Sequence, residues 1–259
     1  MDQIPRTPVL GVGVSAVSLE SAADVILGWI ESARRGGGQK HYVTVTGVHG
    51  VMEAQGDPGF KTILNGSGLT VPDGMPLVWL SKLAGRSHVT RVYGPDLTLA
   101  VSRALGERGF SAFYYGGAPG VAEALASELE RRFPGLERAG TYTPPFRQLT
   151  LDEEQEIARL INGSGADLVW VGLSTPKQER WMARLRESLH PPVLVGIGAA
   201  FDFLTGRARQ APRWVQRSGL EWGFRLVTEP RRLWKRYLRN NPLFIYYLAC
   251  EKLHLKRFD

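Results

Sequence analysis

Residues 168–189, LVWVGLSTPKQERWMARLRESL, pass from a short apolar run through a Ser-Thr-Pro break into a helical pattern. The apolar run predicts a buried strand over 168–173, and the pattern after the break predicts a helix over 177–189. The same succession of strand and helix recurs along the chain. Strands separated by helices of this length need crossover connections, so the sequence predicts an α/β fold with a mostly parallel sheet.

The predicted elements fill most of residues 1–206 and describe a Rossmann-like sheet flanked by helices. In such sheets ligands bind outside the carboxyl ends of the strands, so the polar residues directly after each strand are the candidates for function. The predicted strands are 8–17, 42–46, 69–71, 112–115, 168–173 and 193–197, and the predicted helices are 21–35, 51–64, 75–83, 95–108, 121–133, 152–162 and 177–189.

The positive charge of the chain is concentrated at one end. The 259 residues carry a net charge of +7, yet residues 207–259 alone hold 13 Lys and Arg against 4 Asp and Glu, with 9 of the 25 aromatic side chains. We therefore predict two parts, an α/β body over 1–206 and a basic, aromatic, helical appendage over 207–259. The overall composition, 43% hydrophobic and 22% charged, is typical of soluble globular proteins.

Several chemistries are excluded by the residues present. The lone cysteine, Cys250, rules out an internal disulfide framework and a Cys-rich zinc site, and the chain has no GxxxxGK[ST], HExxH, GxSxG or CxxC motif. The five histidines lack metal-ligand spacing, and no Asp-x-Asp occurs.

The first ten residues do not resemble a signal peptide, and the apolar run 242–250 is shorter than the ~20 residues of a spanning helix, so we expect a cytoplasmic protein.

Polar residues follow two of the predicted strands. Asp73 comes directly after strand 69–71, in VPDG, where it could act as a base. An Asp-Gly turn with Asp73 as a helix cap explains the same position. Thr44 and Thr46 end strand 42–46, and their hydroxyls could bind a substrate, although threonine is also a common strand residue.

Two other strand ends open directly into helices. With Thr175 as the N-cap and Pro176 at the first helical position, Gln178 is the third residue, and a capping box would explain it. Gly116, Gly117 and Gly120 lie in the turn YGGAPG, which could present free backbone N–H groups and a helix N-terminus to an anion. A plain tight turn between strand and helix is an equal alternative for these glycines.

Taken together and in this order, these segments resemble the WecG/TagA/CpsF family of bacterial glycosyltransferases. Members of that family transfer N-acetylmannosamine-type and related sugars onto polyprenyl-diphosphate-linked acceptors. The resemblance covers nearly the whole chain and rests on TVTGVH at 44–49, VPDG at 71–74, RVYGPD at 91–96, STPKQE at 174–179, GAAFDFLTG at 198–206, APRW at 211–214, GLEW at 219–222 and EPRRL at 229–233.

The resemblance implies an inverting, metal-independent transfer from a UDP-sugar on an α/β fold. It places the base on Asp73 and catalytic roles on Gln178 and Thr46, with Thr46 standing where many members have Asn. Thr44 and Arg91 are the predicted substrate contacts in the body. No metal or other cofactor is expected, so the positive charge that steadies the departing UDP must come from arginines and backbone N–H groups.

The appendage is expected to complete the site and to dock on a membrane. Arg225, Arg232 and Arg236 join the turn at 116–120 as candidates for binding the donor diphosphate. Cations at 232, 235, 236 and 239 fall on one helical face, which suits an anionic membrane surface. The predicted partners are a UDP-sugar, a lipid-linked glycan acceptor and the inner face of the plasma membrane; a homo-oligomer is left open, and no nucleic acid is expected.

Two other classes of function stay open on the residues alone. The stretch 11–16, GVGVSA, matches part of a dinucleotide fingerprint and would suit a nucleotide-dependent oxidoreductase. No helical pattern opens at its second glycine, so a strand that kinks at its glycines is the favoured interpretation. The basic tail with its tryptophans would suit nucleic acid, through phosphate contacts and base stacking, but no nucleic-acid module is recognisable.

Overall fold

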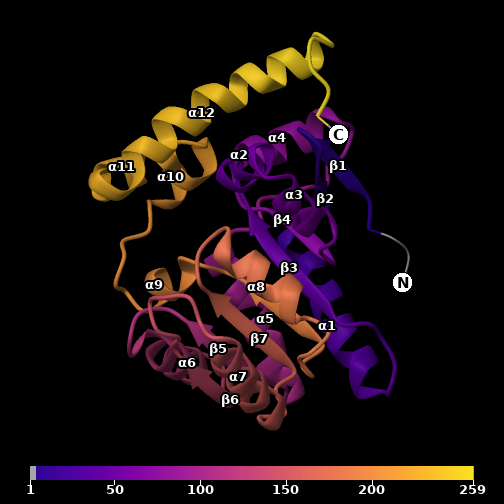
Figure 1. Cartoon of the computed structure of the whole chain (residues 1–259), viewed down its shortest axis with the longest axis vertical. Coiled ribbons are helices and arrows are strands. Elements are labelled where there is room, and N and C mark those ends of the chain that lie inside the picture. Colours follow the sequence, from indigo (N-terminus) through magenta and orange to yellow (C-terminus); the bar gives the residue numbers. More distant parts are fainter. Residues whose placement is uncertain (1–3, 259) are drawn as a thin grey trace.

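A parallel sheet forms the centre of the structure (Figure 1). The computed structural model describes residues 4–258, apart from the side chain of Arg232. Within these residues six strands pair side by side, and every pairing is parallel. Their order across the sheet is β4 (Leu69–Pro72), β3 (His41–Thr46), β8 (Val193–Gly196), β7 (Leu168–Gly172), β5 (Ser111–Gly116) and β6 (Glu137–Tyr142).

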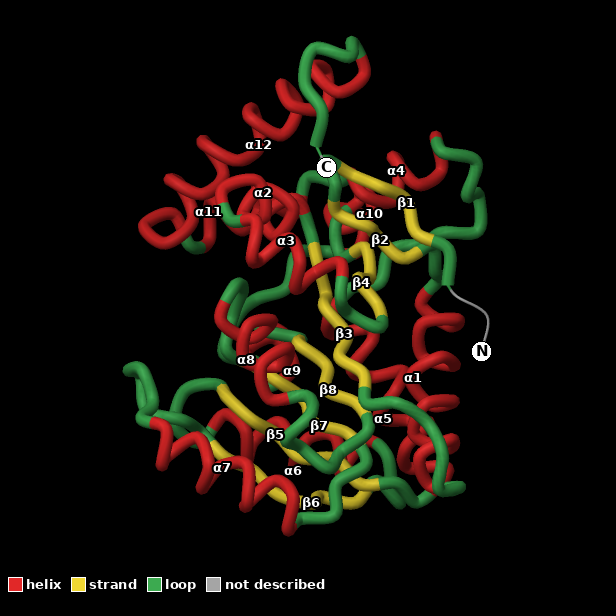
Figure 2. Tube along the Cα trace, turned by 45° about the vertical axis from the view of Figure 1, so that its right-hand side comes forward, coloured by secondary structure: helices red, strands yellow, loops and turns green. Residues whose placement is uncertain are grey.

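Helices cover both faces of this sheet (Figure 2). The helices of the body are α1 (Leu19–Arg34), α2 (Val48–Gly56), α3 (Pro58–Asn65), α4 (Met75–Leu83), α5 (Gly94–Arg108), α6 (Val121–Arg132), α7 (Leu151–Gly163), α8 (Lys177–Leu185) and α9 (Ala200–Leu204). Successive side chains of a strand point to opposite faces, so Ala112 and Tyr114 pack with α1, α5 and α6, whereas Phe113 and Tyr115 pack with α7 and α8. The predicted α/β class is confirmed.

The strand predicted over 8–17 is wrong, because this segment folds into a hairpin. β1 (Arg6–Val9) pairs antiparallel with β2 (Val12–Ser15) outside the main sheet. Leu10 and Gly11 form the turn, with φ of 51° and 77°. A strand rather than a helix therefore follows Gly11, and the dinucleotide interpretation of 11–16 is wrong as well.

Three other boundaries differ from the prediction. The helix predicted over 51–64 is two helices, because the Asp57 carboxylate accepts a hydrogen bond from Phe60 N at 2.9 Å and caps α3, which begins at Pro58. Strand β6 was not predicted, since it is a partly exposed edge strand whose residues, ERAGTY, include few large apolar side chains. Helix α8 ends at Leu185, before the predicted 189.

The described part of the C-terminal region is helical, as predicted. It consists of α10 (Arg213–Ser218), α11 (Glu221–Thr228) and α12 (Pro230–Lys252). α12 runs across α2 (Figure 1), and Phe244 is buried in the core that the hairpin shares with α2 and α3. No helix among residues 4–258 combines the length and the apolar character needed to span a bilayer. The division of the chain at residue 206 stays a prediction.

Candidate active site

Asp73 and Thr46 meet where β3 and β4 end. Thr46 is in register with Pro72, and Asp73 N donates to Thr46 O at 2.9 Å. The Asp73 side chain is one-third exposed, at 33%. It does not cap α4, whose N-cap is Gly74 with no side-chain hydrogen bond. The capping alternative is therefore wrong; the carboxylate is partly exposed at the carboxyl edge of the sheet, and its role as the base stays a prediction.

Arg91 ties Asp73 to the appendage. Its Nε donates to the backbone oxygen of Asp73, and its Nη2 lies 3.5 Å from Asp73 Oδ1 and 2.6 Å from Glu221 Oε2. Nη1 donates to Gln216 O at 3.4 Å. Burial opposes the charge of Arg91, but the carboxylates of Asp73 and Glu221 raise its pKa above the ordinary value, so the guanidinium stays protonated. Arg91 is thus fully engaged by protein groups.

The hydroxyls of Thr44 and Thr46 are bonded inside the protein. Thr46 Oγ1 donates to Thr44 Oγ1 at 3.3 Å, and Thr44 Oγ1 donates to Thr70 Oγ1 at 3.2 Å. Both residues are buried, and α2 packs so closely that a Cβ built on Gly50 would lie 2.9 Å from Thr46 Cγ2. This arrangement matches the strand-residue alternative, and a role in substrate binding stays a prediction for both.

Gln178 lies buried at the start of α8 and forms no capping box. The N-cap of α8 is Pro176 rather than Thr175, and Thr175 Oγ1 donates instead to Glu179 Oε1 at 2.7 Å. Gln178 Nε2 donates to the same Glu179 oxygen at 3.3 Å, while Gln178 Oε1 has no hydrogen-bond partner. Burial raises the pKa of Glu179. A Cβ built on Gly196 would lie 3.0 Å from Gln178 Nε2, so Gln178 sits against the end of β8.

The glycine turn after β5 divides into a packed half and an open half. Gly116 has φ of 122°, and a Cβ there would lie 2.5 Å from Gly172 O. Gly117 N donates to Gly172 O at 3.0 Å. Gly120 is the left-handed N-cap of α6 with φ of 79° and open space around it. The first two glycines therefore serve strand packing, and anion binding by this turn stays a prediction.

Substituting alanine at Gly116 is expected to destabilise the fold strongly. The new Cβ would collide with the backbone of β7 in a conformation that L-residues rarely adopt, at a cost of about 3 kcal/mol or more. Gly120→Ala is the matched control, since it meets no neighbour and costs only about 1 kcal/mol for the left-handed conformation. Chemical denaturation measures both. Equal losses for the two variants would contradict the packing described for Gly116.

Two of the three predicted appendage arginines can be placed. Arg225 reaches the body, with its guanidinium carbon 5.5 Å from the ring centre of Phe203, and pairs with Glu229 at 3.8 Å. Its Nε is buried and has no hydrogen-bond partner among the described residues. Arg236 is partly buried and close enough to His49 to affect its charge. The Arg232 side chain lies outside the described part of the structure, so its predicted role is not placed.

His49 lies between the body and α12, a position that the sequence did not predict. It follows the end of β3 within the TVTGVH segment, and its Nδ1 lies 3.1 Å from Asn240 Nδ2 of α12. Burial and the charge of Arg236 lower the pKa of His49 to about 4. His49 is therefore neutral at physiological pH and joins α2 to α12. Its position after a strand end was the signal that the sequence offered.

The stability of the protein is expected to rise between pH 4 and pH 6.5 because of His49. The unfolded chain binds a proton at this histidine below about pH 6.5 and the folded protein only near pH 4. Stability is therefore lost as the pH falls through this window, by up to about 3 kcal/mol. Denaturation at several pH values should give a smaller slope for His49→Gln, which keeps an acceptor for Asn240. An unchanged slope would contradict the assignment.

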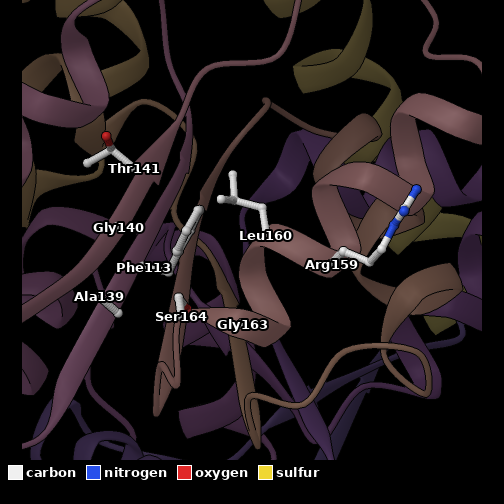
Figure 3. Close-up of a pocket in the computed structure, with 8 residues that line it drawn as sticks. All are labelled: Phe113, Ala139, Gly140, Thr141, Arg159, Leu160, Gly163 and Ser164. Carbon is white, nitrogen blue, oxygen red and sulfur yellow. The ribbon is translucent and has the colours of Figure 1, made fainter.

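Two hollows in the surface lie away from these residues. One of about 410 Å³ opens between β6 and α7, lined by Phe113, Thr141 and Leu160 (Figure 3). A larger one of about 1280 Å³ lies beside the hairpin and includes His41, which begins β3 and so marks the opposite end of the strand. Within the described residues no three His, Cys, Asp or Glu side chains are grouped so as to hold a metal ion, and metal independence stays a prediction.

Comparison with known proteins matches nearly the whole chain. The model described as "Glycosyl transferase WecG/TagA/CpsF family" covers residues 7–258. A relative from Bacillus spizizenii is 33% identical over 187 residues, which are 72% of this chain and 70% of the relative. A relative from Bacillus subtilis is 29% identical over 202 residues, 78% of this chain and 76% of the relative. Both are named N-acetylglucosaminyldiphosphoundecaprenol N-acetyl-beta-D-mannosaminyltransferase.

Proposed function

Because the chain belongs to the WecG/TagA/CpsF family of glycosyltransferases, we propose that it transfers an N-acetylmannosamine-type or related hexose from a UDP-sugar to a polyprenyl-diphosphate-linked acceptor. The product would enter cell-surface polysaccharide synthesis. The observation that carries this proposal is the relative from Bacillus spizizenii, whose name states both an N-acetylmannosaminyl transfer and an undecaprenyl-diphosphate acceptor. The UDP donor follows from the family resemblance of the strand-end motifs.

The proposed chemistry is a single displacement with inversion. The Asp73 carboxylate, exposed at the carboxyl edge of the sheet, accepts the proton of the acceptor hydroxyl. The acceptor oxygen then bonds to the anomeric carbon of the donor, and the bond from that carbon to the UDP oxygen breaks. Asp73 is the best placed of the predicted catalytic residues, since Thr46 and Gln178 are buried.

Positive charge must stabilise UDP as it leaves, and Arg225 is the best placed source. Its side chain is 20% exposed, and its Nε has no hydrogen-bond partner within the described residues, so a small movement of this side chain would let a donor phosphate oxygen accept a bond there. Arg91 is already held by Asp73 and Glu221. We therefore assign diphosphate binding to Arg225 and the positioning of neighbouring groups to Arg91.

We also propose peripheral docking of the appendage on an anionic membrane. The exposed side chains of α12 mix apolar and basic types, among them Trp234, Lys235, Leu238 and Arg239. Leu233 is buried and Arg236 is half-buried, so these two side chains are turned at least partly toward the protein. A mixed surface of this kind suits the headgroup region, where aromatic rings and cations lie together.

A panel of nucleotide sugars tests the reaction class. With a polyprenyl-diphosphate-linked acceptor, the protein should release UDP from one UDP-hexosamine and add one sugar to the lipid. Parallel tubes with NAD measure oxidoreductase activity, and we expect no reduction. Reduction of NAD with no lipid product would reject glycosyl transfer in favour of the alternative.

A further inference from the structure

Glu221 is a largely, but not fully, buried acid that the proposed chemistry does not use. It is the first residue of α11, and its side chain is 14% exposed where it meets Arg91, which is 15% exposed. None of the residues of α11 is fully buried, so this helix has little apolar anchorage. Glu221 Oε2 forms an ion pair with Arg91 Nη2 of the body at 2.6 Å, and Arg225 of the same helix lies over the ring of Phe203.

The environment of Glu221 makes that link costly to break. Burial raises the pKa of Glu221, and the charge of Arg91 opposes this shift. Removing one member of such a pair leaves the other charge buried and uncompensated. Arg225 also faces Glu221, but its nearest carboxylate is Glu229 at 3.8 Å. Arg91 is thus the closest cation to the Glu221 carboxylate among the described residues.

The same guanidinium touches the proposed base. Arg91 Nε donates to the backbone oxygen of Asp73, while Nη2 lies 3.5 Å from the Asp73 carboxylate and only 2.6 Å from Glu221. Glu221 thus competes with Asp73 for one charged group and holds the closer contact. If Asp73 were the only carboxylate paired with the Arg91 guanidinium, the pairing would make Asp73 a weaker proton acceptor.

We propose that Glu221 is a positioning residue that seats α11 on the body and holds Arg91 off the Asp73 carboxylate. The second half of this statement rests on the proposed function, and the first half does not. The ion pair between Glu221 and Arg91 then links the position of α11 to the ability of Asp73 to accept a proton. Without the charge of Glu221, α11 loosens and Arg91 turns to Asp73.

Glu221→Gln tests both halves with two readouts. Hydrogen exchange of the α11 amides, Glu221–Thr228, should rise at least about tenfold as the helix loses its anchor. The kcat for sugar transfer should fall about tenfold or more. The KM for the nucleotide sugar should change less than kcat, because the lost contact acts on the base rather than on the donor.

Arg213→Gln is the matched control. Arg213 forms another ion pair between appendage and body, with Asp96 at 3.3 Å, but it is 72% exposed and does not touch Arg91. Exchange of α11 and kcat should each change less than about twofold, as expected for an exposed pair. A control that matches Glu221→Gln in both readouts would overturn the specific role of Glu221.

The double variant Arg91→Gln with Glu221→Gln identifies the partner. If the ion pair anchors α11, the α11 exchange rates of the double variant should equal those of either single variant. Increases in exchange rate that add up in the double variant would overturn the proposal. Should Glu221→Gln fail to fold, Glu221→Asp keeps the charge with a shorter reach and should give a smaller change in the same direction. Unchanged α11 exchange in folded Glu221→Gln would show that Glu221 does not hold α11 on the body. Faster α11 exchange in Glu221→Gln, when the unaltered protein itself transfers no sugar, rejects the proposed function alone.

Discussion

Asp73→Asn is expected to lower kcat for sugar transfer by about 10²-fold or more. The substitution removes the proton acceptor and keeps nearly the same shape. The backbone contacts of this residue, from Asp73 N to Thr46 O and from Arg91 to Asp73 O, are unaffected by the change. Binding of the UDP-sugar and the melting temperature should therefore change little. Steady-state kinetics, calorimetry and thermal unfolding measure the three quantities.

Asp96→Asn is the control for this experiment. Asp96 lies in the first turn of α5 and, like Asp73, pairs with an arginine, but its partner is Arg213 rather than Arg91. Its removal should leave kcat within about twofold of the unaltered protein. Turnover retained by Asp73→Asn would show that another group accepts the proton. A general loss of folding would show that Asp73 is structural.

Reversing the exposed charges of α12 should weaken binding to anionic vesicles by about 10²-fold or more. Lys235→Glu with Arg239→Glu replaces two cations by two anions, and each cation near an anionic surface contributes about 1 kcal/mol. Both residues are exposed, so thermal stability should be unchanged. Vesicle sedimentation at low salt measures binding. Phe244 is part of the core, so deleting the appendage would confuse docking with folding.

Arg103→Glu with Arg159→Glu controls for net charge. These residues are exposed on α5 and α7, in the body, and the double change alters the total charge by the same amount. Vesicle binding should stay close to that of the unaltered protein if α12 is the docking surface. Equal losses for the two double variants would mean that overall charge, rather than α12, drives association.

The central sheet was predictable because its strands are buried on both faces. Segments such as 168–173 are nearly continuous apolar runs, which parallel sheets require and which are easily recognised. β6 was not predicted because an edge strand needs no such apolar run. The hairpin was not predicted because its turn, at Leu10 and Gly11, lies within an apolar stretch. Local patterns thus define the core and leave edges and turns undetermined.

The candidate site was predictable in part. The position of Asp73 after a strand follows from the order of elements, since parallel strands bring their carboxyl ends to one edge. The ion pair between Arg91 and Glu221 does not follow from the order of elements, because it joins residues that are distant in sequence and no periodic pattern marks it. The buried bonds of Thr44 and Thr46 are likewise set by packing against Thr70 and α2. The sequence predicts that such residues lie near a site, but not which of their atoms are already hydrogen-bonded within the protein.

The most direct test of the proposed function is an NMR analysis of the lipid-linked product formed in the presence of EDTA. We expect one added hexosamine per UDP released, with the anomeric configuration opposite to that of the donor, and no loss of rate from the chelator. Retention of configuration, a strict requirement for Mg²⁺ or Mn²⁺, or UDP release with no sugar on the lipid would contradict it.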